Sequence, residues 1–499
     1  MSTSPPRTTG GGVALGQASG RWVLLATVLG SGMASLDATV VTIALPSIGA
    51  DLGGGLATLQ WVLNGYTLTL AAFLLLGGSL GDVLGRRRVF VIGAVGFAAA
   101  SLLCALAPTA PLLVGARLLQ GVAGALLTPG SLAIISATFT GTQRSAAIGA
   151  WSGLSGLAGA AGPFVGGYLL NVLSWRWIFL LNLPLATAVV FVSLRHVPET
   201  RDPDAPQQLD LGGAALGAVA LGALTYGLID AGANGLTAVG TSCIVLAVVA
   251  AGGFVQVERR SPHPMLPLEV FSSARFTGTN VVTFVVYAAL SATFFLLVLQ
   301  LQLVAGFSPL ASGAALLPVT AVMLAGSARV GAAAARWGPR PFMTAGPVVA
   351  AVGLLLMLRI GPGATWGTEV LPAVIVFGIG LTLTVAPLTA AVLMAAPASH
   401  AGVASGVNNA VARTAGLLAI AVLPLAVGLN DESYRNPVLF DRAFDRGVVI
   451  AALLLVVGGG LSALLVGGRE PHPSQPEEKR YCCPVDGPPL QADAVGGAT

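Results

Sequence analysis

The sequence predicts an all-α integral membrane protein that crosses the bilayer fourteen times. Charged residues make up only 9% of the 499 positions and hydrophobic residues make up 55%, and the mean hydropathy is +0.85. These values lie far outside the composition of soluble globular domains. Apolar runs of about 18 to 28 residues fill most of the chain, and about 20 helical residues span the hydrocarbon core of a membrane.

The apolar runs follow one another along the chain, with short polar connections between them. The first run is long, carries an aspartate and ends without a small-residue cleavage site, which favours a helix over a signal peptide. The fourteen spans are expected, to within a few residues, at Trp22–Leu45, Thr58–Leu80, Val89–Leu106, Leu112–Phe139, Ala146–Leu170, Ile178–Leu194, Leu211–Ile229, Leu236–Val257, Phe276–Val304, Leu310–Ala335, Phe342–Ile360, Val370–Ala395, Gly402–Leu429 and Val448–Val466.

Basic residues predict the orientation of the chain. When the connections are assigned alternately to the two membrane faces, 16 of the 24 Lys and Arg residues fall on the side of the N-terminus and 5 on the other. The remaining three, Arg117, Arg329 and Arg413, lie inside spans. Because cytoplasmic loops are enriched in basic residues, we expect a bacterial cytoplasmic membrane protein with both termini in the cytoplasm. The net charge of +4 therefore reflects orientation, and arginines scattered over short loops argue against nucleic-acid binding.

Polar connections divide the chain into two halves with an inserted helix pair. The N-terminal arm is rich in Gly, Ser, Thr and Pro, the tail is rich in Pro and charge, and neither shows periodicity. We expect a disordered cytoplasmic arm at 1–18, a six-helix bundle at 19–196, a linker with two inserted helices at 197–258, a second six-helix bundle at 259–468 and a disordered cytoplasmic tail at 469–499.

The connection between the second and third spans is short, glycine-rich and strongly charged. It carries Gly78, Asp82 and Gly85 and then three arginines at 86–88, which are costly to bury and keep the turn at the cytoplasmic face. Asp82 precedes Arg86 by four residues, so the two can pair. A glycine, three residues, an Asp, two residues, a glycine and basic residues resemble the loop between helices two and three of the major facilitator superfamily, where it serves as a gating loop.

A faint copy of this loop lies in the second half. Gly331 and Gly338 take the places of the two loop glycines, but Ala335 replaces the aspartate. The resemblance implies the major facilitator fold, in which two parallel six-helix repeats enclose a substrate site. The degenerate copy implies that the charged loop gates one half only.

Asp37 is the leading candidate for mechanism, because it lies deep in the first span. An ionised carboxylate inside a membrane is costly unless it is paired, and such residues are functional by default. Burial favours the protonated form of a carboxyl group and a nearby cation favours the ionised form, so such a site can be tuned to accept and release a proton. The alternative is a fixed buried ion pair with Arg117, and fixed pairs are weak stabilisers in apolar surroundings.

Arg117 and Gln120 lie on one face of the fourth span. The guanidinium stays charged, so Arg117 cannot carry the proton but can influence the acid. Gln120 can hydrogen-bond that pair or a ligand. Arg, two residues, Gln and Gly at positions 117–121 resemble the fourth-helix motif of the same superfamily.

The fifth span has small residues at spacings of three and four, which favour close helix packing, and a proline that bends the helix. Its glycines alone indicate generic packing. The full set resembles the antiporter signature of drug exporters and comprises Gly159, Gly162, Pro163, Gly166 and Gly167. With the segments at 60–66 and 174–184, the resemblance is to the fourteen-helix drug:proton antiporters of the EmrB/QacA type, over residues 20–468. Some members carry an acid for divalent cations in the tenth span, and this chain has none there.

Polar and aromatic residues inside spans are weaker candidates for the substrate cavity, because each alone is more often a packing or helix–helix contact. With Gln120 they are Trp61, Asn64, Tyr66, Trp151, Asn409 and Arg413. Asn409 and Arg413 share a helix face.

The sequence excludes several other functions. Its only lysine, Lys479, has no glycine run before it, so no nucleotide-binding P-loop is present, and the Gly-x-Ser-x-Gly at 77–81 lacks a strand–turn–helix context. No cysteine and histidine spacing fits zinc, so we expect no enzyme, metal or cofactor.

The resemblance implies a monomeric, proton-coupled exporter of hydrophobic, neutral or monocationic drugs or toxic compounds, working by alternating access. Proton-coupled export of one endogenous metabolite, such as an antibiotic or a lipid, is an alternative. A non-transporting membrane sensor is a third hypothesis, which the intact loop, Asp37 and the antiporter signature disfavour.

Overall fold

The computed structural model describes residues 15–203, 209–395 and 401–466, so the predicted tail and nearly all of the predicted arm lie outside the described residues. The described chain is helical and contains no strand. Its first half consists of α1 (Ala18–Leu52), α2 (Leu56–Leu84), α3 (Arg86–Leu106), α4 (Ala110–Thr138), α5 (Gly141–Val172), α6 (Arg176–Leu180) and α7 (Asn182–His196), followed by α8 (Leu211–Asn234) and α9 (Ala238–Arg260).

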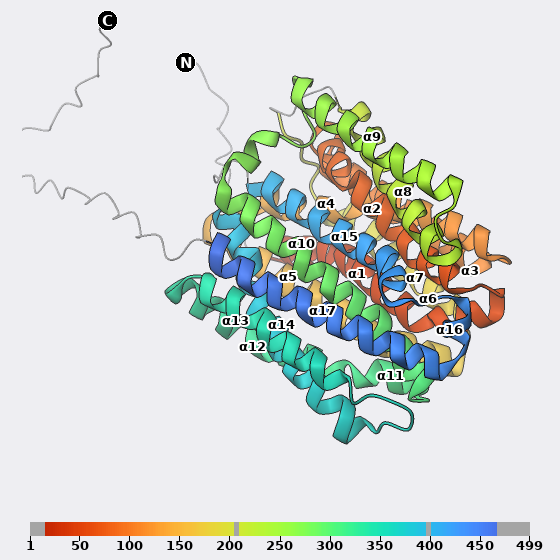
Figure 1. Ribbon diagram of the computed structural model, residues 1–499. Coiled ribbons are helices and arrows are strands. Elements are labelled where there is room, and N and C mark those ends of the chain that lie inside the picture. Colours follow the sequence, from red (N-terminus) through yellow and green to blue (C-terminus); the bar gives the residue numbers. More distant parts are fainter. Residues whose placement is uncertain (1–14, 204–208, 396–400, 467–499) are drawn as a thin grey trace, which may run out of the picture.

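The second half begins with the single turn η1 (Leu268–Ser272). It continues with α10 (Ala274–Leu299), η2 (Gln300–Val304), α11 (Pro309–Ala315), α12 (Leu317–Trp337), α13 (Arg340–Met357), η3 (Trp366–Val370), α14 (Leu371–Met394), α15 (Ala401–Val427), α16 (Asp431–Arg435) and α17 (Pro437–Leu465). Figure 1 shows these helices running roughly alongside one another as one bundle.

Each predicted span coincides, within a few residues at most ends, with one long helix or with two consecutive helices. Thirteen of the described helical segments are long and apolar enough to cross a membrane. The exception is α5, which is 32 residues long and owes its lower hydropathy to its many glycines. The tenth span is broken between α11 and α12, where Pro318 enters the first turn of α12.

One boundary differs from the expectation in a way that matters. The last span was expected from Val448, but α17 begins at Pro437. Asn436 caps it by accepting from the backbone N–H groups of Val438 and Leu439. Asp441 and Asp445 therefore lie within α17, a helix long and apolar enough to cross the membrane. Asp441 accepts a hydrogen bond from the buried Gln300 at 2.5 Å.

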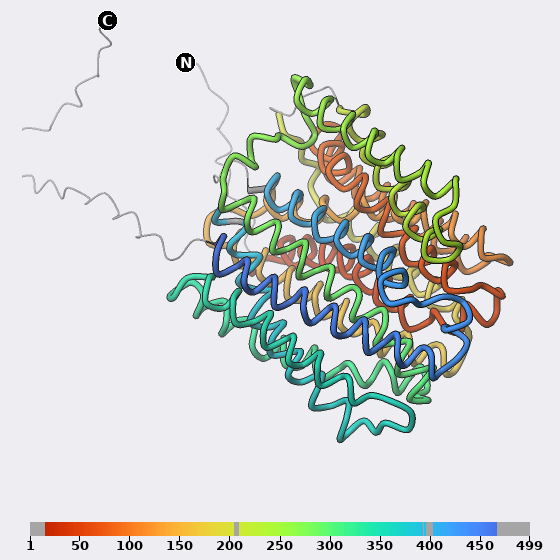
Figure 2. Tube along the Cα trace, in the orientation of Figure 1, coloured from red at the N-terminus to blue at the C-terminus, as the bar shows by residue number. Residues whose placement is uncertain are grey.

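The inserted pair α8 and α9 packs together and lies along one side of the bundle, where α8 contacts α2 and α15. Figure 2 shows this pair along one edge and α12 to α14 along the opposite edge. Thr237 caps α9 and accepts from the N–H of Gly240 at 2.9 Å. The pair therefore extends the bundle without separating its halves.

Hydrogen bonds between the two halves gather at one end of the bundle. Because successive spans alternate in direction, the start of α1 and the end of α17 lie on one side, here called the terminal side; the other is the distal side. Among described residues, every hydrogen bond between the halves lies on the distal side. Gln60 donates to the carbonyl of Ile420 at 2.7 Å, and Gln302 donates to that of Ile43 at 3.0 Å.

Candidate functional site

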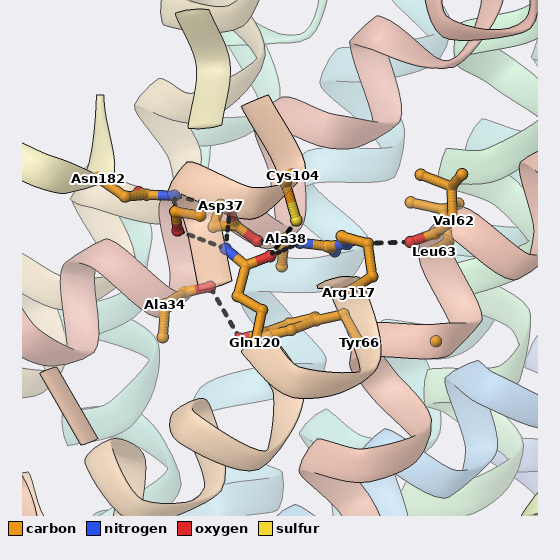
Figure 3. A network of polar contacts seen from close by, with 12 residues as sticks. Ala34, Asp37, Ala38, Val62, Leu63, Tyr66, Cys104, Arg117, Gln120 and Asn182 are labelled. Carbon is orange, nitrogen blue, oxygen red and sulfur yellow. Dashed lines mark hydrogen bonds and ion pairs between the residues drawn. The ribbon is translucent and has the colours of Figure 1, made fainter. Parts of the chain in front are cut away.

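Asp37 lies near the middle of α1 and is 1% exposed. Both of its carboxylate oxygens are hydrogen-bonded (Figure 3). Oδ2 accepts from Nη1 of Arg117 at 2.5 Å, while Oδ1 accepts from Nε2 of Gln120 at 2.8 Å and from Nδ2 of Asn182 at 2.9 Å. Three donors from two other helices therefore compensate the loss of water around this carboxylate.

Arg117 makes several contacts besides its ion pair with Asp37. Its Nε donates to the carbonyl of Val62 at 3.0 Å, and its Nη1 also donates to Oε1 of Gln120 at 2.6 Å. The guanidinium carbon lies 4.5 Å from the centroid of the Tyr66 ring, a cation–π contact. Tyr66 is itself buried and donates its hydroxyl to the carbonyl of Ala34 at 3.4 Å.

A second set of polar groups supports the first. Ser101 of α3 accepts from Gln120 at 2.9 Å and from Asn182 at 3.2 Å. The site thus draws on α1, α2, α3, α4 and the start of α7. The sequence analysis found Asp37, Arg117 and Gln120 but missed Ser101 and Asn182. Asn182 did carry a signal, because it is the polar residue of an otherwise apolar run just before Pro184.

This cluster places a buried carboxylate against a buried guanidinium. An ionised Asp37 balances the charge of Arg117, whereas a protonated Asp37 leaves a buried cation without its counter-ion, which is strongly unfavourable. Asp37 is shielded from solvent in this structure.

The charged loop between α2 and α3 forms the predicted pair. Nε and Nη2 of Arg86 both lie 2.8 Å from Oδ1 of Asp82. The loop is also tied to the chain that leaves α7. Glu199 accepts from the backbone N–H of Arg87 at 3.1 Å, and the N–H of Arg86 donates to the carbonyl of Thr200 at 2.9 Å.

Gly85 is the glycine that this loop requires. Its φ is +114°, a conformation that side chains with a Cβ rarely adopt. A Cβ there would also lie 2.6 Å from Oε1 of Glu199. Sequence analysis missed Glu199, which lies more than a hundred residues along the chain from the loop.

The small residues of α5 serve two contacts. Gly159, Gly162 and Gly166 face α1, where a Cβ at Gly166 would lie 3.0 Å from Val40. Gly167 faces α11 of the other half, where a Cβ would lie 2.5 Å from the carbonyl oxygen of Pro309. The segment therefore packs one half internally and joins the two halves at the distal side.

The predicted cavity residues fall into different surroundings. Gln120 and Tyr66 belong to the buried Asp37 cluster, and Trp151 donates to Ser31 of α1 at 3.0 Å. Trp61 lies 6.2 Å from Tyr226 of α8, ring to ring. The remaining three, Asn64, Asn409 and Arg413, lie on α2 and α15.

Comparison with protein families decides the identity of the fold. The model of the Major Facilitator Superfamily matches residues 27–420. The chain belongs to the major facilitator superfamily. It is therefore a multi-pass membrane transporter of small molecules and not an enzyme.

Relatives within this superfamily are efflux and resistance proteins. The probable actinorhodin transporter of Streptomyces coelicolor is 35% identical over 415 residues, covering 81% of this chain and 72% of that protein. The tetracenomycin C resistance and export protein of Streptomyces glaucescens is 36% identical and covers 80% and 74%. The multidrug efflux pump LfrA of Mycolicibacterium smegmatis is 36% identical and covers 78% and 77%.

Solved structures of superfamily transporters share the fold at low sequence identity. The inward-open xylose transporter XylE from E. coli aligns with a TM-score of 0.60 at 15% identity, over 90% of this chain and 96% of that one. A POT family transporter in complex with 5-aminolevulinic acid aligns with a TM-score of 0.67 at 12% identity, over 89% and 96%. Both confirm the predicted all-helical major facilitator fold.

Proposed function

We propose that this protein exports small hydrophobic compounds across the cytoplasmic membrane in exchange for protons. The observation that carries the proposal is the buried Asp37, whose charge is balanced by Arg117 and whose two oxygens are both hydrogen-bonded. A carboxylate so placed inside a membrane bundle is a natural proton carrier. The efflux and resistance proteins to which the chain is similar support export as the direction.

Orientation follows from the basic residues. With both termini in the cytoplasm, the terminal side is cytoplasmic and the distal side faces outward. The hydrogen bonds of Gln60 and Gln302 then close the outer end. A single chain then exports its cargo by alternating access, in which the halves at 19–196 and 259–468 open to one side of the membrane and then to the other. The α8 and α9 pair lies beside these halves.

The cycle couples Asp37 to cargo. Cargo enters from the cytoplasm while Asp37 is ionised and paired with Arg117. When the outer end opens, a proton from outside neutralises Asp37 and releases Arg117, and this rearrangement favours the release of cargo. Return to the cytoplasm-facing state lets the proton leave, so the paired state forms again.

A dedicated exporter of one endogenous compound is the second candidate. Two relatives bear the names of single antibiotics, actinorhodin and tetracenomycin C. Such a role would use the same coupling cluster and differ only in the residues that contact cargo.

Drug susceptibility in an efflux-deficient host tests the proposal. Expression of the protein should raise the inhibitory concentration of several hydrophobic antibiotics, and Asp37→Asn should abolish the increase. Asp51→Asn is the matched control, because Asp51 lies at the distal end of the same helix in an exposed pair with Arg176. Everted vesicles should show the same contrast, with the mutant protein inserted at wild-type level. Proton-driven efflux at the wild-type rate by the Asp37→Asn protein would refute the coupling role.

A further inference from the structure

Arg413 lies on the face of α15 that meets α2. Gly406 of α15 packs against Leu75 of α2, because a Cβ at Gly406 would lie 3.1 Å from Cδ2 of Leu75. Further along α15, the carbonyl of Ile420 accepts a hydrogen bond from Gln60 of α2. Gly406, Arg413 and Ile420 are seven residues apart, a spacing that returns to nearly the same helix face. Arg413 therefore lies halfway along the seam between the two halves of the protein.

The helix that carries Arg413 packs between two others, because α15 contacts both α2 and α10 (Figure 1). The side chain is partly exposed. Within the described residues, no carboxylate lies within 4.0 Å of its guanidinium.

Arg117, unlike Arg413, has a counter-ion among the described residues. Arg117 is neutralised by Asp37 at 2.5 Å, and that carboxylate is 1% exposed with all its donors in place. Asp37 therefore presents no charge to a molecule between the halves, whereas Arg413 does. An unpaired cation in mid-membrane is costly unless it meets water or an anion.

Asn64 supplies an independent observation on the same seam. It lies one helical turn after Gln60 on the same face of α2, and it is 0% exposed. Neither its amide nitrogen nor its amide oxygen has a hydrogen-bond partner, which is rare for a buried side chain. The antiparallel register places it about 5 Å from the level of Arg413 along the helix axis.

We infer that Arg413 and Asn64 together bind an acidic group of the exported molecule, a carboxylate, sulfonate or ionised phenol. The guanidinium supplies charge and paired donors, and the amide supplies a further donor one turn away. This inference rests on the proposed function and adds the charge of the cargo to it.

A matched pair of fluorescent probes tests the charge preference. The anion is 1-anilinonaphthalene-8-sulfonate, and the neutral partner is N-phenyl-1-naphthylamine, which lacks only the sulfonate. Uncoupler-sensitive accumulation is measured in everted vesicles, so that passive binding to lipid is subtracted. Wild-type protein should transport the sulfonate with the lower half-saturation concentration.

Substitutions at the two residues then separate charge from shape. Arg413→Gln should raise the half-saturation concentration for the sulfonate about ten-fold or more and leave that for the naphthylamine within about two-fold. Arg413→Lys, which keeps the charge, should restore most of the affinity, and Asn64→Leu should weaken the sulfonate selectively. Arg329→Gln is the control, because Arg329 is exposed on α12 and bonds to its own helix at Ala325.

Two results would overturn the inference. One is a wild-type protein that transports the naphthylamine but not the sulfonate. The other is an Arg413→Gln protein that transports both probes equally poorly. If that variant does not insert, the same result with Arg413→Lys would overturn the inference. Failure of the proposed function looks different, because no probe and no antibiotic would then be transported and Asp37→Asn would change nothing.

Discussion

Gly313 of α11 packs directly on the carbonyl of Pro163 in α5, where any Cβ would overlap the oxygen. The contact joins the two halves at the distal side and is matched by Gly167 against Pro309. The proline and glycines of α5, whose sequence resembles the antiporter signature, thus also form a joint between the two halves at one end of the protein. In the proposed alternating-access cycle, this joint forms and separates once per turnover.

The first prediction is that Gly313→Val blocks this closure. Overpacking a tight contact costs about 1–3 kcal/mol, which shifts a two-state equilibrium about 5- to 150-fold. Efflux should fall at least about ten-fold, and a cysteine introduced at Ser308 should react faster with an impermeant thiol reagent from outside. Gly331→Val is the control, because nothing lies within 4 Å of a Cβ at that glycine. Unchanged labelling with unchanged efflux would contradict the role of the joint.

The second prediction concerns the pH dependence of efflux. Hydrogen bonds to a carboxylate favour its ionised form, and Asn182→Ala removes one donor from Asp37. A hydrogen bond to a charged group contributes about 1.5 kcal/mol or more, equivalent to about one pH unit. The pH of half-maximal efflux should therefore rise.

Asn234→Ala is the control for this shift, since Asn234 is exposed and bonds to Asp230 at the end of α8. Efflux is measured in vesicles across a series of internal and external pH values. A lower maximal rate with an unmoved profile would show that Asn182 is structural and leaves the proton equilibrium alone.

The sequence and the structure agree where function depends on residues close in the chain. Asp82 and Arg86 pair four residues apart, and Arg117 meets Gln120 three residues apart, both as the helical spacing predicts. All fourteen spans were recognisable because hydropathy is a local property. The pairing of Asp37 with Arg117 was also predicted, but only as an alternative to a freely titrating acid, and the ion pair is compatible with both.

Other parts of the site required packing information that no local pattern contains. Ser101 and Asn182 reach Gln120 and Asp37 only because α3 and α7 lie beside α4 and α1. Glu199 meets Arg87 because the chain returns to the α2–α3 loop after four more spans. The early start of α17 was missed because Asp441 and Asp445 interrupt its apolar run.

The third prediction concerns the charged loop. Asp82→Ala removes the partner of Arg86 and loosens the loop, so it should slow turnover several-fold while changing the affinity for cargo less than about two-fold. Stopped-flow efflux and equilibrium binding separate the two effects. Asp51→Asn is the control, because it neutralises the exposed pair with Arg176 but keeps an acceptor for Trp175, and it should change neither, as expected for surface pairs. Lost binding with normal turnover would refute a gating role.

The fourth prediction concerns the charge moved in one transport cycle. One titrating acid in the Asp37 cluster implies one proton per cycle, so exchange for a monocation moves no net charge, a neutral cargo moves one and a monoanion moves two. Each charge is worth about 2.3 kcal/mol per 100 mV, roughly a fifty-fold gradient. In proteoliposomes with potassium diffusion potentials, an inside-negative potential should therefore stimulate export of the anilinonaphthalene sulfonate most and should not stimulate export of a monocationic dye.

A dication should be poorly exported, because its exchange for one proton moves positive charge outward against the potential. Vigorous uncoupler-sensitive export of a dication would contradict the one-proton cycle and direct attention to Asp441 and Asp445 as a second acidic site.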